Sequence, residues 1–573
     1  YETWKETGDT KGWNIKYYKG LGTSTGKEFK EYMAKKKLVF FNKQQGTTDG
    51  TESADKDSDS IDMAFNKQRA CDRKKWLEAY NKNLYLDTNS EMISYYDFIH
   101  KEMIHFSKYD CARSIPNIMD GLKTSQRKIL FTAFKRKLTN EIKVAQFSGS
   151  VSEISCYHHG ESSLNGAIVN MAQDYIGSNN INLFVPNGQF GTRLLGGNDS
   201  ASERYIHTNL NKITRYIFPE HDDGVLDYLD DDGTPVEPVY YAPIIPMALV
   251  NGSKGIGTGF STDIMCYNPS NIIKYIRAHL NNEELPSILP YYEGFKGTIT
   301  PLSKTKWLFK GVYDIISETD VHITELPIGL WTNDYKKYIE DLIEGGDKNK
   351  KSKGVVRDYV DMSTHVTVDF TIRFLPGVIQ NMIVTETEHG CNSLEKLLKL
   401  YSTKSTSNMH LFDENEKLIK HDRPEEISNH FIDVRMNVYV KRKEYQVKLL
   451  EHETMVLTNK ARFISDILND KLDLRRKKRD VVNALLTKEG YDVIDNDSDY
   501  KYLVRLPMDS VTQENYDKLV QDKNNKIQEL QILKATSEKD IWLSELDNLE
   551  KQYSTYKDKR NNVSFKKKIK VKK

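Results

Sequence analysis

Two segments in the last third of the chain constrain its fold more than any other feature. In each, side chains recur at intervals of mainly four and seven residues: Val438, Tyr445, Leu449, Val456, Phe463 and Ile467 in the first, and Leu519, Val520, Ile527, Leu530 and Lys534 in the second. This spacing places them in one stripe along a helix. We expect two long antiparallel helices with a small domain at their far end, at about residues 470–511. A single helical bundle is the alternative.

Length and charge indicate several domains and a local affinity for polyanions. A chain of 573 residues exceeds the size of one hydrophobic core. The formal net charge is only +1, but the cations are clustered: residues 113–143 hold eight cations and two acids, and residues 566–573 are almost wholly basic. A concentrated basic face is typical of proteins that bind nucleic acid.

The same sequence excludes several classes of protein. The cysteines are scattered without paired spacing, at Cys71, Cys111, Cys156, Cys266 and Cys391. This pattern favours a reducing compartment and indicates neither a zinc site nor a disulfide framework. No apolar run is long enough to cross a bilayer, and no signal peptide is visible. Because the chain opens on Tyr1 in place of Met, we expect it to be part of a longer protein.

A glycine-rich run leads into an Arg-Tyr pair, Arg204-Tyr205. A phenol titrates near pH ~10, so it is a poor nucleophile unless a neighbouring cation stabilises the reacting charge. Arg204 is such a cation, because it does not lose its proton. Taken alone, the pair would more often be an ordinary core tyrosine beside a surface arginine. The spacing of Ile206, Leu210 and Ile213 predicts that a helix follows.

Other patterns predict the remaining elements. We expect a helix at 27–35 capped by Ser24 or Thr25, a flexible acidic insert at 44–60, helices at 118–137 and 164–175 in a winged-helix arrangement, β-rich runs between 226 and 410, and a final helix that Ser537 caps.

Nine short motifs, in order along the chain, resemble the breakage-reunion core of eukaryotic-type type IIA DNA topoisomerases. They are residues 17–24, 113–116, 120–123, 126–128, 157–161, 189–193, 204–206, 249–252 and 255–259. The resemblance implies a multidomain α+β chain: the C-terminal part of a TOPRIM domain (1–40), a linker with an acidic insert (41–95), a winged-helix DNA-binding domain with the catalytic tyrosine (96–225), an α/β tower (226–412), a long antiparallel coiled coil with a small C-gate domain (413–553), and a basic tail (554–573).

The resemblance also implies roles for individual residues. Tyr205 matches the tyrosine that forms a 5′-phosphotyrosyl bond, and Arg204 its transition-state stabiliser; His159 and Arg113 complete the catalytic set. The DNA-binding positions are Lys67, Gln68, Lys123, Arg127, Lys128, Tyr157, Ser163, Ile256, Lys460 and Arg462. Ile256 matches a wedge that intercalates between base pairs and bends the duplex. Unstacking one base step costs roughly a few kcal/mol, which the added contacts of the bent DNA offset.

Three of these assignments have plainer alternatives. His158 and His159 could be a capping or core pair, and Ile256 could be a turn residue that fills a small core. Lys460 and Arg462 could belong to an ordinary helix face. The run Gly255–Gly259 lacks the Lys-Ser/Thr that would make it a phosphate-binding P-loop.

The family uses Mg²⁺, held by TOPRIM carboxylates, and ATP. We expect both sites upstream of Tyr1 and neither on residues of this chain. Three acidic runs could substitute for the missing carboxylates, at 57–59, 230–232 and 495–499, but each is more simply a solvated segment.

The sequence thus predicts the DNA-binding and cleavage core of an ATP-dependent homodimer that passes one DNA duplex through another. We expect double-stranded DNA as partner in two segments, no membrane, and an intracellular location, in the nucleus or at a viral replication site. Two alternatives stay open: a tyrosine recombinase or nicking enzyme, and a non-catalytic DNA-bending scaffold.

Overall fold

The computed structural model describes residues 4, 7–8, 12–13, 24–36, 38–42, 55–87, 90–231, 233–344, 354–494, 497, 499–507 and 510–571, with side chains described as far as residue 561. The chain divides into two compact units, residues 1–109 and 110–573. The two units are described separately below.

The first unit is mainly helical. Its helices are α2 (Gly26–Ala34), α3 (Lys56–Phe65), α4 (Ala70–Glu78) and α5 (Tyr95–Phe98), followed by a π-helical turn (Ile99–Met103) and by α6 (Ile104–Ser114); strands β1 (Phe40–Phe41) and β2 (Met92–Ile93) pair in parallel. Thr25 caps α2 through a capping box with Glu28, which confirms the expected helix and its start. Residues 17–23, which carry most of the first family motif, lie outside the described residues.

Part of the expected acidic insert is ordered. Residues 56–60 form the first turns of α3. Asp57 is buried and accepts a hydrogen bond from the backbone N–H of Tyr96, while Asp59 forms an ion pair with Arg69 at 2.6 Å. The prediction of a flexible insert is therefore wrong for these residues, because tertiary partners satisfy their carboxylates. Residues 44–54 of the expected insert lie outside the described residues.

The second unit begins with a helical domain built around α7 (Thr124–Lys135), α8 (Val144–Ile154) and α9 (Glu161–Ala172). Short strands β3 (Ile142–Lys143) and β4 (His207–Thr208) pair antiparallel beside α8, and α10 (Thr214–Ile217) follows. The buried faces of the three helices share one core with residues as distant as those of the last helix, α20 (Glu538–Val571). Three helices with a small paired wing agree with the expected winged-helix arrangement.

Two predicted helices in this domain differ from the structure. The helix expected at 118–137 begins only at Thr124, because Asp120 accepts hydrogen bonds from Leu122 and Tyr241 in a turn that requires a positive φ at Gly121. The helix expected after Tyr205 does not form. His207 there pairs with Lys143 and Asn187, so its backbone groups are used in strand bonds.

Two hairpins and a helix follow. They are β5 (Tyr228–Asp231) with β6 (Thr234–Pro238), β7 (Ser253–Gly257) with β8 (Phe260–Ile264), and α12 (Pro269–Asn281), with the short α11 (Met247–Val250) between the hairpins.

The tower region contains two antiparallel sheets. One has the order β15 (Tyr401–Ser405), β10 (Lys306–Lys310), β9 (Thr298–Ser303); the other has the order β11 (Val312–Ile315), β12 (Asp320–Glu325), β14 (Phe370–Phe374), β13 (Val356–Asp361). Helices α13 (Thr332–Ile343), α14 (Val378–Val384) and α15 (Ser393–Leu397) share a separate core with the second sheet. The hairpin β16 (Met409–Phe412) and β17 (Leu418–His421) leads out of this region.

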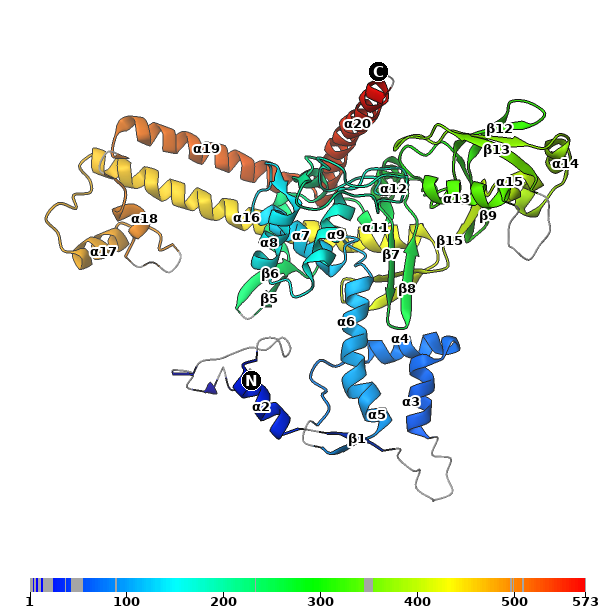
Figure 1. Ribbon diagram of the computed structural model, residues 1–573. Coiled ribbons are helices and arrows are strands. Elements are labelled where there is room, and N and C mark those ends of the chain that lie inside the picture. Colours follow the sequence, from blue (N-terminus) through cyan, green and yellow to red (C-terminus); the bar gives the residue numbers. More distant parts are fainter. Residues whose placement is uncertain are drawn as a thin grey trace. The chain divides into compact units, whose positions relative to one another are not determined.

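The two long helices are present. Helix α16 (Pro424–Leu468) and helix α19 (Gln513–Ala535) run side by side (Figure 1), and Glu451 and Glu453 of α16 form ion pairs with Lys534 and Lys526 of α19. Because the partner number falls as the α16 number rises, the pair is antiparallel. A small domain with its own core, including α17 (Arg479–Lys488) and α18 (Lys501–Val504), connects their far ends.

The last helix, α20 (Glu538–Val571), returns to the body of the unit. Ser537 caps it by accepting the N–H of Asp540, as expected. Trp542 is completely buried and its indole N–H donates to the carbonyl of Ile244 at 3.0 Å. Within the described residues, no helix is both long and apolar enough to span a membrane.

We predict that Trp542→Ala lowers the free energy of unfolding of this body by about 3–5 kcal/mol, since it leaves a cavity and an unpaired carbonyl. Denaturant unfolding followed by near-ultraviolet circular dichroism measures the change. The control is Ile532→Ala, at a side chain 58% exposed on α19, which should shift stability by less than about 0.5 kcal/mol. Equal effects of the two substitutions would contradict the docking of α20.

Candidate nucleic-acid interface and active site

Tyr205 is exposed on a turn whose flanks are fixed. Its side chain is 78% exposed, while the next residue, Ile206, is 1% exposed in the core. The backbone N–H of Val144 donates to the carbonyl of Ile206, and that of Ala145 donates to the carbonyl of Glu203. The phenol therefore reaches solvent from a backbone held against the start of α8, and Arg204 beside it is also exposed.

The preceding glycine run packs too closely for larger residues. Gly191 has φ +98°, and a Cβ there would lie 2.4 Å from the carbonyl oxygen of Gly197. The buried amide of Gln173, just after α9, donates to the carbonyls of Phe190 and Gly197. The glycines thus shape a tight loop, and Gln173 ties it to the end of α9.

An open groove of about 640 Å³ lies next to this turn. Arg204 and Glu203 line one side, and Glu161, Ser162 and Asn165 of α9 line the other. The side-chain oxygen of Asn165 is buried and has no hydrogen-bond partner among the described residues. The groove thus places the cation Arg204 and residues of the first turns of α9 beside the turn that carries Tyr205.

Arg113 and His159 lie close enough for the charge of Arg113 to act on the His159 ring. The rings of Tyr157 and His159 meet edge to face at 5.4 Å, and Ser163 is exposed on the first turn of α9. Partial burial lowers the pKa of His159, and the charges of Arg113, His158 and Lys128 lower it further. His159 is therefore neutral near pH 7 and keeps one donor and one acceptor nitrogen. His158 instead lies 3.1 Å from Asp231.

Ile256 has the geometry of a wedge. It lies in β7 of the hairpin and is 79% exposed, which excludes the alternative that it fills a small core. Lys254, two residues earlier on the same strand, is exposed as well. Sequence analysis missed Lys254, although strand alternation with Ile256 could have found it. The ammonium of Lys123 donates to the carbonyl of Lys254 at 2.7 Å, so Lys123 supports the hairpin, and burial lowers its pKa.

Three expected DNA contacts, Arg127, Lys128 and Arg462, bind other groups of the protein. Arg127 is 7% exposed and forms an ion pair with Asp120 at 2.7 Å; Lys128 pairs with the buried Glu237 at 2.8 Å. The structure does not support either as an exposed phosphate contact, because their charges compensate buried carboxylates.

The third is Arg462. Its guanidinium donates to the carbonyls of Glu489 and Gly490 and stacks on Tyr491, which favours the alternative of a structural helix face. Lys460 is half-buried on the same helix.

Lys67 and Gln68 belong to the first unit. Both are exposed in a 3₁₀ turn (Lys67–Arg69), which the side chain of Asn66 caps through the backbone N–H of Gln68.

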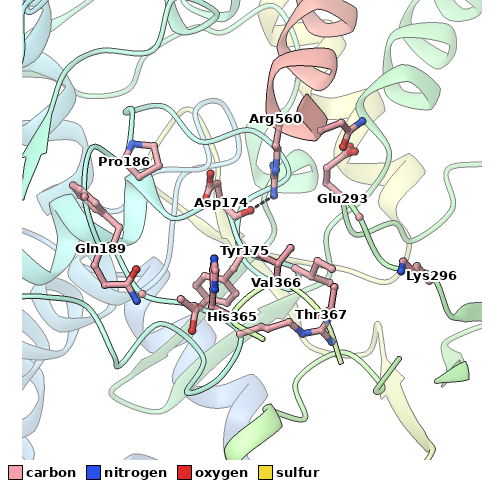
Figure 2. A pocket seen from close by; sticks show the side chains of 18 residues that line it. Asp174, Tyr175, Pro186, Gln189, Glu293, Lys296, His365, Val366, Thr367 and Arg560 are labelled. Carbon is pink, nitrogen blue, oxygen red and sulfur yellow. Dashed lines mark hydrogen bonds between the residues drawn. The ribbon is translucent and has the colours of Figure 1, made fainter. Parts of the chain in front are cut away.

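A cavity of about 350 Å³ lies behind the glycine run (Figure 2). Arg560 of α20 reaches its wall and donates to the carbonyls of Asp174, Asn179 and Asn180. These bonds hold α20 to the segment that follows α9.

No group of three or more His, Cys, Asp or Glu side chains among the described residues is arranged to hold a metal ion. Asp57 and Asp59 are engaged as described above. Asp230 accepts the backbone N–H of Gly233, and Asp232 lies outside the described residues. In the run 495–499, Asp497 and Asp499 pair with Lys501. Residues 495, 496 and 498 lie outside the described residues. The described carboxylates do not fit a magnesium site.

Comparisons with known proteins decide the family. The family model for the DNA gyrase/topoisomerase IV A-type polypeptide matches residues 113–547, and that of the C-terminal associated domain of TOPRIM matches residues 1–111. This chain belongs to the type IIA DNA topoisomerases. The TOPRIM-associated match is longer than the 1–40 expected from the sequence.

Individual relatives agree. The chain is 42% identical to a DNA topoisomerase 2 of Plasmodium falciparum over 96% of its length and 40% of the relative's, and 36% identical to that of Acanthamoeba polyphaga mimivirus over 96% and 52%. A crystal structure of the Plasmodium falciparum topoisomerase II DNA-binding, cleavage and re-ligation domain matches with a TM-score of 0.82 and 42% identity, covering 99% of this chain and 77% of that one. The chain spans about two fifths of the length of the first curated relatives.

These findings confirm the predicted family and the multidomain α+β fold. The roles of individual residues stay predictions.

We predict that His159 titrates below its ordinary pKa of about 6.5. Because the folded state binds this proton more weakly than the unfolded chain, the stability that His159 contributes is present above about pH 6.5 and is lost as pH falls through the lowered pKa. Arg113→Ala should raise the pKa partway, since burial, the larger cause, remains. NMR titration of labelled histidines measures it, with His159→Gln to assign the signal. A pKa that Arg113→Ala leaves unchanged would contradict the proximity of the two groups.

Proposed function

We propose that this chain is the DNA-binding and cleavage core of an ATP-dependent type IIA topoisomerase. The observation that carries the proposal is the exposed Tyr205, fixed beside the exposed Arg204 on an anchored turn, in a member of this family. A buried phenol could not reach a DNA backbone, and a phenol on a loose loop would lose the benefit of orientation.

The proposed reaction exchanges one phosphodiester for another. The phenolic oxygen of Tyr205 bonds to a DNA phosphorus, and the bond from phosphorus to the 3′ oxygen breaks. The product is a 5′-phosphotyrosyl link and a free 3′ hydroxyl, and the proton lost by the phenol is matched by the one gained at the 3′ oxygen. Resealing reverses the same steps.

The chain's own cations support this exchange. Arg204 stabilises the charge that develops on the phosphate. Arg113, the neutral His159 and Ser163 hold the backbone near the reacting phosphate, and Lys254 adds a contact at the hairpin. Tyr157, an expected DNA contact, is only 9% exposed and instead packs edge to face against His159. Lys67, Gln68, Lys123 and Lys460 remain proposed DNA contacts.

The proposed partners are two duplexes and a second copy of this chain. One duplex is bent and cleaved on both strands, and the other passes through the break. We propose Mg²⁺ and ATP as cofactors bound outside the described carboxylates of this chain; Mg²⁺ would stabilise phosphoryl charge. The expected location is intracellular, in a nucleus or at a viral replication site.

We predict that Tyr205→Phe in the natural full-length protein abolishes the covalent DNA adduct while duplex affinity stays within about twofold, since the phenol supplies the reacting oxygen and little of the electrostatic grip. Denaturant trapping with Mg²⁺, followed by peptide mapping, identifies the linked residue. Tyr216→Phe, at another exposed tyrosine of the same domain, is the control.

The polarity of the adduct separates the rival functions. A link to the 3′ end would indicate a recombinase-like enzyme. Unchanged supercoil relaxation by Tyr205→Phe would indicate a scaffold.

We predict that Ile256→Ala reduces DNA bending much more than affinity for linear duplex, because a methyl group cannot hold two base pairs apart. Energy transfer between dyes at the two ends of a duplex reports the bend, and anisotropy reports the affinity. The control is Leu229→Ala on β5, at a side chain 43% exposed. Proportional losses of bending and affinity would argue against a wedge.

A further inference from the structure

The connection between α16 and α17 carries a dense run of cations. Residues 471–479 contain six basic residues, Lys471, Arg475, Arg476, Lys477, Lys478 and Arg479, and one acid, Asp473. All of these side chains are exposed. Figure 1 shows this connection at the end of the coiled coil that is remote from the body of the unit. We call it the basic loop.

Two leucines hold the basic loop and direct its cations outward. Leu472 is 4% exposed in the core of the small domain, and Leu474 packs against that core. The backbone N–H groups of Lys471 and Leu472 donate to the carbonyl of Asp466 at the end of α16. The loop is therefore anchored by its apolar residues, and its charged side chains are left to solvent.

Most of the loop's charge is not compensated within the protein. Arg475 pairs with Asp473, and Arg479 pairs with Asp499. The other four, Lys471, Arg476, Lys477 and Lys478, form no ion pair with any residue that the structure describes. Of the acidic residues that follow in the domain, Asp497 and Asp499 both contact Lys501.

The end of the loop adds to the local positive field. Lys478 is the N-cap residue of α17, and its side chain makes no capping hydrogen bond. A cation at a helix N-terminus is unfavourable, because the helix dipole is positive there. Asp480 places one acidic side chain in the first turn of α17. An external polyanion would further offset the repulsion among the consecutive cations Arg476, Lys477 and Lys478.

We propose that the basic loop is a second DNA-binding surface that contacts the phosphate backbone of a duplex at the far end of the coiled coil. Four free cations on an anchored loop suit a repeating anion that is recognised without regard to sequence. This inference rests on the proposed function, because the duplex that the basic loop binds is the second duplex, which is not held at Tyr205.

The test uses the whole chain with the Tyr205 face first saturated by an unlabelled 30-base-pair duplex. A second, fluorescent duplex is then titrated at several salt concentrations and followed by anisotropy. The test variant replaces Lys471, Arg476, Lys477 and Lys478 by Gln. The control variant replaces four exposed lysines that form no ion pair among the described residues and lie elsewhere in this unit, Lys274, Lys304, Lys337 and Lys551.

The expected result is a loss of about tenfold or more in affinity for the second duplex in the test variant. The slope of log affinity against log salt should fall by about 2–4, because roughly 0.9 counterions are released for each phosphate neutralised. The control variant should change the affinity by less than about twofold. Equal losses in the two variants would overturn the proposal. Displacement of the labelled duplex by polyglutamate as readily as by unlabelled duplex would also overturn it, in favour of an acidic protein partner.

Failure of the proposed function gives a different result. The covalent adduct at Tyr205, measured in the natural full-length protein, and the affinity for the first duplex report that function, and the basic-loop substitutions should leave both unchanged. Loss of second-duplex binding with a normal adduct therefore supports the basic loop alone. A missing adduct with normal second-duplex binding would instead contradict the assignment of Tyr205.

Discussion

The proposed reaction depends on one constraint: the phenol of Tyr205 must be exposed and its backbone must be held in place. Tyr205 meets both demands because the residue after it is buried and the backbone on both sides is bonded to the start of α8. The glycine run closes against itself, and Gln173 and Arg560 tie the surrounding segments to α9 and α20. The start of α8 thus holds the turn that carries Tyr205, and Gln173 and Arg560 hold the segments next to it.

Charge is divided between support and binding. Arg127, Lys128 and Arg435 are paired with Asp120, Glu237 and Asp222 in the interior, where losing one partner would leave a costly uncompensated charge. Arg113, Arg204 and Lys254 are exposed on the proposed DNA-binding face. The net charge of +1 does not distinguish the buried, paired cations from the exposed ones. The two groups differ in burial, which the sequence does not show.

This division explains what the sequence could predict. The long helices were predictable, because the side chains spaced by four and seven residues in α16 continue over many turns, and such a long pattern outweighs exceptions at single positions. Tyr205, Arg204 and Ile256 stood out through their motifs. Arg127 was not predictable as a buried residue, because its partner Asp120 is seven residues away across a turn that forms only in the folded chain. The strand pairing of His207 was likewise hidden, since an apolar spacing of three and four does not reveal a competing pairing with Lys143.

A structure of the chain bound to a duplex and trapped before cleavage would test the central claim most directly. The account predicts the phenolic oxygen of Tyr205 and the guanidinium of Arg204 against the same DNA phosphate, with the backbone running past His159 and the side chain of Ile256 between two base pairs. A duplex bound on another face, with Tyr205 still in solvent, would contradict it.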